Sequence, residues 1–156
     1  MMGHRLMGSS VNIAEARAHY DQALLLYEPT EHRPLAARFG QDVRVAILSN
    51  RSLPLWLLGY PEAALADAEQ ALKYARETSQ AATLMFALCY TSLTCLLWAD
   101  YAGAKALIDE LVALANEKGA LFWKASGILL HGQLCAVEGK ATEAVEAITF
   151  SLAAIR

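Results

Sequence analysis

The segment Ala81–Ala99 reads AATLMFALCYTSLTCLLWA and contains no charged side chain. A membrane-spanning helix needs about 18 or more apolar residues, a length that this segment reaches. However, five of its residues carry hydroxyl groups, and neither flank, Gln80 or Asp100, offers the basic anchor that marks a membrane surface. A helix that is apolar on all sides and not in lipid is buried among other helices. We therefore expect this segment to lie inside a helical stack, and we expect no membrane contact.

Less apolar segments of the same kind occur once before and once after Ala81–Ala99. Amphipathic helices follow each of them, because apolar residues recur there at spacings of three and four. Pro54 lies inside one apolar segment and predicts a kink near Asn50. The expected helices cover residues 13–27, 35–39, 43–58, 62–78, 81–99, 101–118, 121–138 and 142–156, with a short further helix near residues 5–9.

The composition favours an all-helical protein without a nucleic-acid partner. Hydrophobic residues make up 56% of the 156 residues, and Ala and Leu dominate, as in helical proteins. The net charge of -3 offers no basic surface to a phosphate backbone. The N-terminal segment has no apolar core of the kind found in signal peptides. Cys89, Cys95 and Cys135 form no even disulfide framework, so we expect buried thiols and a cytoplasmic location.

Small residues recur along the chain with a period of 40 residues. They lie midway along the apolar helices and near the start of the amphipathic ones. The positions are Ser52, Ser92 and Gly132 in the first group and Ala64, Ala104 and Ala144 in the second, with Ala16 at 48 residues before Ala64. A small side chain at a crossing lets two helix backbones approach to about 8 Å. This period predicts a row of stacked helical hairpins.

Ala64, Ala68 and Ala71 follow the spacing of the tetratricopeptide repeat, although the repeat unit is longer. The segments HRPLAARFGQD (32–42), LWLLGYPEAAL (55–65) and EKGALFWKA (117–125) resemble the C-terminal repeat region of bacterial signalling proteins. In those proteins a class III adenylate cyclase domain and a predicted ATPase domain precede the repeats. The helical region of maltose-regulator-type transcription activators is a more distant relative. The resemblance implies an all-α, right-handed tetratricopeptide-like superhelix of about three and a half hairpins.

We expect the whole chain, residues 1–156, to form a single repeat domain. Residues 13–27 are the second helix of an incomplete first hairpin, and residues 35–78 are the second hairpin with a short extra helix. Residues 80–118 and 121–156 are the third and fourth hairpins. The sequence contains neither the cyclase nor the ATPase domain of the proteins that it resembles. The resemblance therefore implies a regulatory scaffold without cyclase activity.

The sequence shows no pattern typical of catalysis, cofactor binding or metal binding. The four histidines have no partner at zinc-ligand spacing, and His131 is expected to be a satisfied histidine on an apolar helix. Residues 139–141 lack both the preceding strand and the hydroxyl residue of a phosphate loop. The carboxylates of the amphipathic helices, including Asp67 and Asp109, are typical of a solvated outer face. We expect no catalytic, cofactor-binding or metal-binding residue.

In repeat arrays of this type the first helices of the hairpins line a concave surface. The inward positions run from Ala46 to Leu57, from Phe86 to Leu97 and from Ser126 to Val137, and they make an apolar face. These side chains either pack against the neighbouring hairpin or accept an apolar helix or peptide. In the second case Trp56→Ala and Phe86→Ala lower partner affinity with little loss of stability. The candidate groove residues are Ser49, Leu53, Trp56, Phe86, Cys89, Leu93, Ser126, Leu129 and Gln133.

The last helix, residues 142–156, is apolar at five positions and carries little charge. These positions are Val145, Ile148, Phe150, Leu152 and Ile155. Because a solenoid needs polar caps, we expect self-association or further repeats to cover this end. The leading hypothesis is a non-catalytic scaffold that binds a protein or peptide partner. The alternative is a small-molecule sensor whose ligand occupies the apolar groove.

Overall fold

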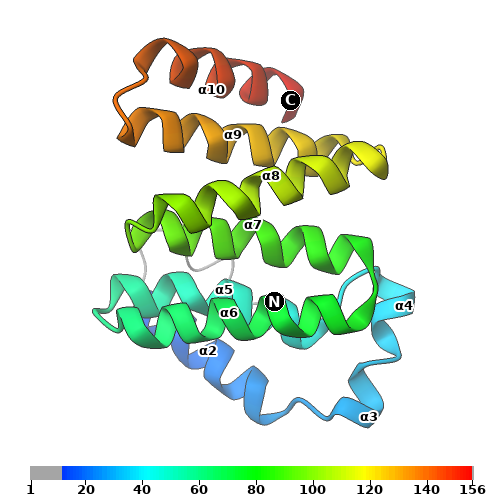
Figure 1. The fold of residues 1–156 in the computed structure, drawn as a ribbon. Helices are drawn as coiled ribbons and strands as arrows, with labels where there is room; N and C mark the ends of the chain where they lie inside the picture. The colour runs from blue at the N-terminus through cyan, green and yellow to red at the C-terminus, as the bar shows by residue number, and fades with distance from the viewer. Residues whose placement is uncertain (1–11, 156) are drawn as a thin grey trace. The chain divides into compact units, whose positions relative to one another are not determined.

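A computed structural model describes residues 12–155 of the chain, and within this range every regular element is a helix (Figure 1). The all-α prediction is therefore confirmed. The short helix expected near residues 5–9 lies outside the described residues. The helices are α2 (Ile13–Leu25), α3 (Pro29–His32), α4 (Leu35–Phe39), α5 (Val43–Leu57), α6 (Pro61–Thr78), α7 (Ala81–Leu97), α8 (Tyr101–Glu117), α9 (Leu121–Val137) and α10 (Ala141–Ile155).

The chain forms two compact units, one up to Ala87 and the other from Leu88. The boundary falls inside α7, so the first two turns of this helix belong to the first unit and the rest to the second. The expectation of a single domain over residues 1–156 stays a prediction.

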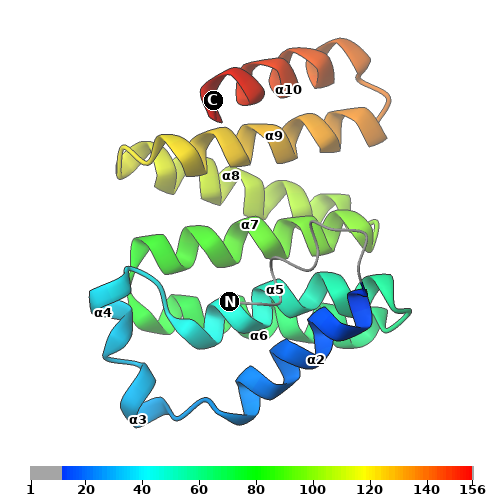
Figure 2. The same cartoon turned by 180° about the vertical axis from the view of Figure 1, so that it is seen from behind.

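In the first unit α5 and α6 form an antiparallel hairpin, and α2 packs on α5 (Figure 2). The core of this unit consists of Val45, Leu48, Ala71, Ala75 and Ala87, which come from α5, α6 and the start of α7. The helix α5 begins as predicted, because the carboxylate of the N-cap residue Asp42 accepts a hydrogen bond of 3.0 Å from the backbone N–H of Val45. Pro54 is buried inside α5, which remains a helix from Val43 to Leu57.

In the second unit α9 lies between α8 and α10, and consecutive helices run in opposite directions (Figure 1, Figure 2). Gly132 shows why the crossing of α9 and α10 needs a small residue. A Cβ atom at this position would lie 2.9 Å from Cγ1 of Ile148 and 3.1 Å from Cβ of Ala147. Gly127 plays the same part at the crossing with α8, since its Cβ would lie 2.6 Å from Cγ2 of Val112.

The other small residues of the 40-residue period are also buried. These are Ala16, Ser52, Ala64, Ser92, Ala104 and Ala144. The turns repeat with the same period, because Gly59, Ala99 and Gly139 all have positive φ angles, of 84°, 62° and 79°. The structure therefore confirms that the small residues of the period are buried and that Gly132 meets Ala144 where α9 and α10 cross, and the turns share the period.

The hydroxyl groups of α7 are satisfied within the protein, which explains how this uncharged helix carries so many of them. Thr83, Thr91, Ser92 and Thr94 are buried. The hydroxyl of Ser92 donates to the backbone carbonyl of Leu88 over 2.7 Å, and that of Thr83 accepts the backbone N–H of Asp42 over 3.0 Å. Among the described residues, no helix has both the length and the apolar character that crossing a membrane requires.

Candidate functional site

The structure places the predicted groove residues of the first unit at different depths. Leu53, Trp56 and Phe86 are half-buried, so part of each side chain is exposed to solvent. Ser49 is buried, and its Oγ atom has no hydrogen-bond partner. Helical register alone placed Ser49 on the inward face, but packing covers this side chain. We therefore remove Ser49 from the set of residues that a partner could contact.

The predicted groove residues of the second unit lie nearer to the surface. Cys89, Leu93, Ser126 and Leu129 are half-buried, and Gln133 is exposed. The Ser126 hydroxyl donates to the backbone carbonyl of Phe122 over 2.9 Å, so it is already satisfied inside its own helix. Burial raises the pKa of the Cys89 thiol to about 11. A thiol of this kind stays neutral and unreactive at neutral pH, so Cys89 is a packing residue rather than a nucleophile.

The helices α5, α7 and α9 each end in an exposed apolar residue, and these residues are at equivalent positions of the 40-residue period. Leu57 ends α5, Leu97 ends α7 and Val137 ends α9, and successive members of this set are 40 residues apart. Their exposed fractions are 53%, 37% and 56%. A single exposed leucine is ordinary on a protein surface. The same exposure at the same register in α5, α7 and α9 is a repeated feature of these helices.

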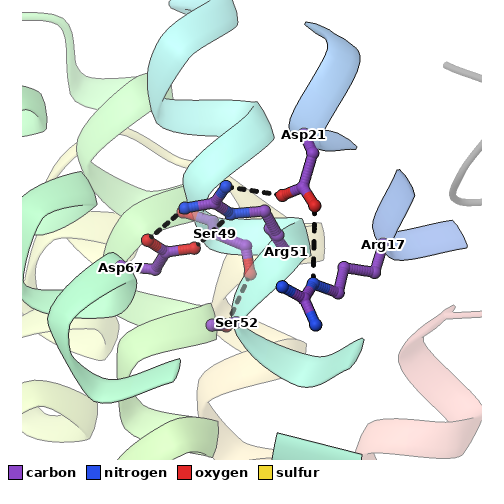
Figure 3. A network of polar contacts seen from close by, with 6 residues as sticks. All are labelled: Arg17, Asp21, Ser49, Arg51, Ser52 and Asp67. Carbon is purple, nitrogen blue, oxygen red and sulfur yellow. Dashed lines mark hydrogen bonds and ion pairs between the residues drawn. The ribbon is translucent and has the colours of Figure 1, made fainter. Parts of the chain in front are cut away.

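A network of charged side chains joins three helices of the first unit (Figure 3). Arg51 of α5 binds Asp67 of α6 through two parallel bonds, from Nε to Oδ2 over 2.6 Å and from Nη2 to Oδ1 over 2.8 Å. Its Nη1 atom donates to Oδ1 of Asp21 on α2 over 2.7 Å. Arg17 extends the network, with its Nε atom 3.4 Å from Oδ2 of Asp21.

This network was not predicted, and the expectation that Asp67 lies on a solvated outer face is wrong. Asp67 is buried, because it lies three residues after Ala64 and directly before Ala68, on the side of α6 that faces α5. Hydrogen bonding to Asp67 raises the pKa of Arg51, which stays charged. The Nε, Nη1 and Nη2 atoms of this guanidinium all donate to carboxylates of the same unit. The network therefore holds α2, α5 and α6 together and leaves little capacity for a ligand.

Cys135 and His131 form a contact in the second unit that resembles a cysteine–histidine nucleophile. The Sγ atom of Cys135 lies 3.6 Å from Nδ1 of His131 and 4.0 Å from Oε2 of Glu143. In a cysteine–histidine nucleophile the carboxylate orients the histidine, whereas here it contacts the sulfur. Cys135 is also buried, so a substrate would not reach it. Among residues 12–155 no group of three or more His, Cys, Asp or Glu side chains is arranged to hold a metal ion.

A shallow hollow of about 360 Å³ lies between α8 and α9. Its lining is mostly apolar, with one histidine, one aspartate and one asparagine. The lining residues are Ile108, Asp109, Val112, Ala113, Asn116, Ile128 and His131. None of the nine predicted groove residues lines this hollow. Sequence patterns could not have located it, because it depends on how far two helices separate beside their crossing.

The chain was compared with family models, with curated proteins and with solved structures. No family model matches it, no curated protein matches it, and no solved structure matches it.

Proposed function

We propose that this chain is a non-catalytic protein-interaction module, built as a right-handed solenoid of helical hairpins. The 40-residue period of buried small residues supports the repeat, because a repeat array places equivalent residues at equivalent crossings and Gly132 lies at one of them. The sequence resemblance to the repeat region of adenylate-cyclase-type signalling proteins is consistent with such a role. On this proposal the module acts in the cytoplasm and regulates or assembles other proteins.

The observation that carries the proposal is the exposure of Leu57, Leu97 and Val137. Each of these residues lies at an inward position of the proposed solenoid, and each exposes more than a third of its side chain. Helix-in-groove recognition uses apolar anchors presented at regular spacing. On the proposed fold, the three side chains are anchors for an apolar helix or an extended peptide of a partner protein.

The proposal is tested by comparing partners captured from the source cells after chemical cross-linking. The baits are the wild-type chain, the variant Val137→Ser and the matched control Leu121→Ser. Leu121 is exposed at the start of the same helix, but it is not an inward position. We expect Val137→Ser to reduce capture of at least one protein that wild type and Leu121→Ser retain equally. Identical sets for all three baits, or the same loss with both variants, would argue against the proposed face.

A small-molecule sensor is the second candidate, and the hollow between α8 and α9 is the observation that favours it. Its volume of about 360 Å³ falls in the range of ligand pockets, and His131 could supply an orienting hydrogen bond. A fragment that binds there should raise the melting temperature of the wild-type chain, and Ala113→Trp should abolish the rise, because Ala113 is exposed and lines the hollow. A fragment-induced shift that survives this substitution would place the ligand elsewhere.

A further inference from the structure

A small cavity of about 160 Å³ lies in the first unit, beside the N-terminus of α5. It is formed by α3 and the residues that flank it, by the start of α5 and by the end of α6. The lining residues are Tyr27, Pro29, Arg33, Asp42, Arg44, Tyr74 and Thr78. At about 30 Å³ for each water molecule, the cavity has room for about five of them, which is the size of a small organic acid.

Two aromatic rings hold the guanidinium of Arg44 at this cavity. Its Cζ atom lies 4.0 Å from the ring centroid of Tyr74 and 5.7 Å from that of Tyr27. The negative face of an aromatic ring attracts a cation in this position. The rings thus position the guanidinium, but a ring face does not take up the conventional hydrogen bonds of its N–H donors.

The charge of Arg44 lacks the carboxylate partner that three other arginines of the same unit have. The ion pairs of those arginines are Arg17–Asp21, Arg33–Glu77 and Arg51–Asp67. Among the described residues Arg44 forms no ion pair, and its contacts are the two tyrosine rings. Arg17 is the closest comparison, because its guanidinium also lies over a tyrosine ring, at 4.7 Å from the centroid of Tyr60.

The other ionisable groups of the lining do not neutralise Arg44. The carboxylate of Asp42 is buried and caps α5, where it accepts a backbone N–H over 3.0 Å. Arg33 has its own partner, Glu77, at 3.7 Å. Tyr27 does not supply a negative charge, because burial and, after it, the charge of Asp42 raise its pKa. One positive charge therefore remains at Arg44, in the first turn of α5, where the helix dipole favours an anion.

We propose that this cavity binds a carboxylate group, which pairs with the guanidinium of Arg44. A guanidinium presents its donors as a planar fork that matches the two oxygen atoms of a carboxylate. A carboxylate also brings the single negative charge that balances Arg44, whereas a phosphate group brings up to two and would place the excess beside Asp42. The carboxylate belongs to a small free acid or to an acidic side chain of a protein. The cavity does not include Leu57, Leu97 or Val137, so the two proposals can fail independently.

The test is a titration of the full chain, followed by amide correlation NMR spectra at constant ionic strength. The two probes are propionate and its neutral isostere propionamide. We expect propionate to cause saturable shifts of the backbone amides of Tyr74 and Thr78, and propionamide to bind at least about 10-fold more weakly. This comparison needs no substitution, so it does not depend on the folding of a variant.

Substitutions then assign the group that binds the carboxylate. Arg44→Met keeps an unbranched side chain against the tyrosine rings and should weaken propionate binding by about 10-fold or more. The matched control is Arg17→Met, which removes a guanidinium that lies over a tyrosine ring but already has a carboxylate partner. It should change the affinity by less than about twofold. The dispersion of the amide spectra verifies that both variants are folded.

A blocked peptide distinguishes the two sources of the carboxylate. The peptide acetyl-Gly-Glu-Gly-amide presents the group from a side chain, and the same peptide with glutamine is its control. An affinity for the glutamate peptide at least equal to that for propionate supports a protein side chain, and a lower affinity supports a free acid. Three outcomes would overturn the proposal: no saturable shift with propionate up to about 50 mM, equal affinity for propionate and propionamide, or equal effects of Arg44→Met and Arg17→Met.

Discussion

Removing the guanidinium of Arg51 should destabilise the first unit by about 2 to 3 kcal/mol. The side chain of Arg51 is 20% exposed and that of Asp67 is 9% exposed, and two bonds of 2.6 and 2.8 Å join them. Breaking a fully buried pair costs about 3 to 5 kcal/mol, whereas an exposed pair contributes about 0 to 1 kcal/mol. The Arg51 pair lies between these limits and nearer the first, because Arg51→Met leaves the carboxylate of Asp67 buried without its partner.

The matched control is Lys105→Met. Lys105 and Asp109 also form an ion pair of 2.6 Å, but both side chains are 58% exposed. Solvent screens this pair, so its loss should cost no more than about 0.5 kcal/mol. The shortest N–O distance is 2.6 Å in both pairs, but the Arg51 pair is more buried and Arg51 makes two further bonds.

The assay is urea unfolding followed by circular dichroism. With a slope of about 2 kcal/mol/M, Arg51→Met should lower the unfolding midpoint by about 1 to 1.5 M, and Lys105→Met by less than about 0.3 M. The double variant Arg51→Met, Asp67→Leu should recover much of the loss, because it removes the stranded carboxylate. Equal midpoint shifts for the two single variants, or strictly additive effects in the double variant, would refute the reasoning.

Three further predictions follow from backbone strain, close packing and burial. Ala99→Gly should raise the free energy of unfolding in urea by about 0.5 to 1 kcal/mol, because φ at Ala99 is 62° and glycine adopts this angle without strain. The control Ala102→Gly, in the first turn of α8, should lower the free energy of unfolding. Gly132→Val should lower the free energy of unfolding by about 1 to 3 kcal/mol, because the new side chain would collide with Ile148. At the exposed position Ala136, the change to Val should lower it by less than about 0.5 kcal/mol. Similar losses for the two variants would contradict the close crossing. A variant that keeps Cys89 as its one cysteine should react with Ellman's reagent at pH 8 about 100-fold more slowly than a thiol of pKa 9 does. The reaction should accelerate as the pH rises toward 11. Rapid modification at pH 8 would disprove the effect of burial on the pKa of this thiol.

Much of the fold could be predicted from the sequence because small residues mark helix crossings directly. Ser52, Ser92 and Gly132 are all buried, and Gly132 lies where α9 and α10 cross, so a single period located three buried small residues. The hydroxyl groups of Ala81–Ala99 also correctly indicated a helix packed within protein. One element was missed: the expected helices leave residues 28–34 uncovered, whereas Pro29 opens the short helix α3 there. Proline suits the first turn of a helix as well as the residue after one.

The side-chain contacts were harder to predict because helical spacing gives the direction of a residue but not its depth. Ser49 lies on the predicted face, yet neighbouring side chains cover it completely. The partners of Arg51 are 16 and 30 residues away in the sequence, on different helices, so no local pattern identifies them. The exposure of Leu57, Leu97 and Val137 likewise depends on which neighbours reach the ends of the first helices. The candidate sites were therefore predicted less completely than the helices.

The solenoid arrangement is tested most directly by electron–electron distance measurements between spin labels. Labels are attached in pairs at positions 57, 97 and 137, after Cys89, Cys95 and Cys135 have been replaced by alanine. Because each step crosses two helix layers of about 8 to 10 Å, the 57–97 and 97–137 distances should be similar, at about 20 Å. The 57–137 distance should then approach twice that value. A 57–137 distance equal to or shorter than the other two would show a closed bundle and contradict the proposed row of stacked hairpins.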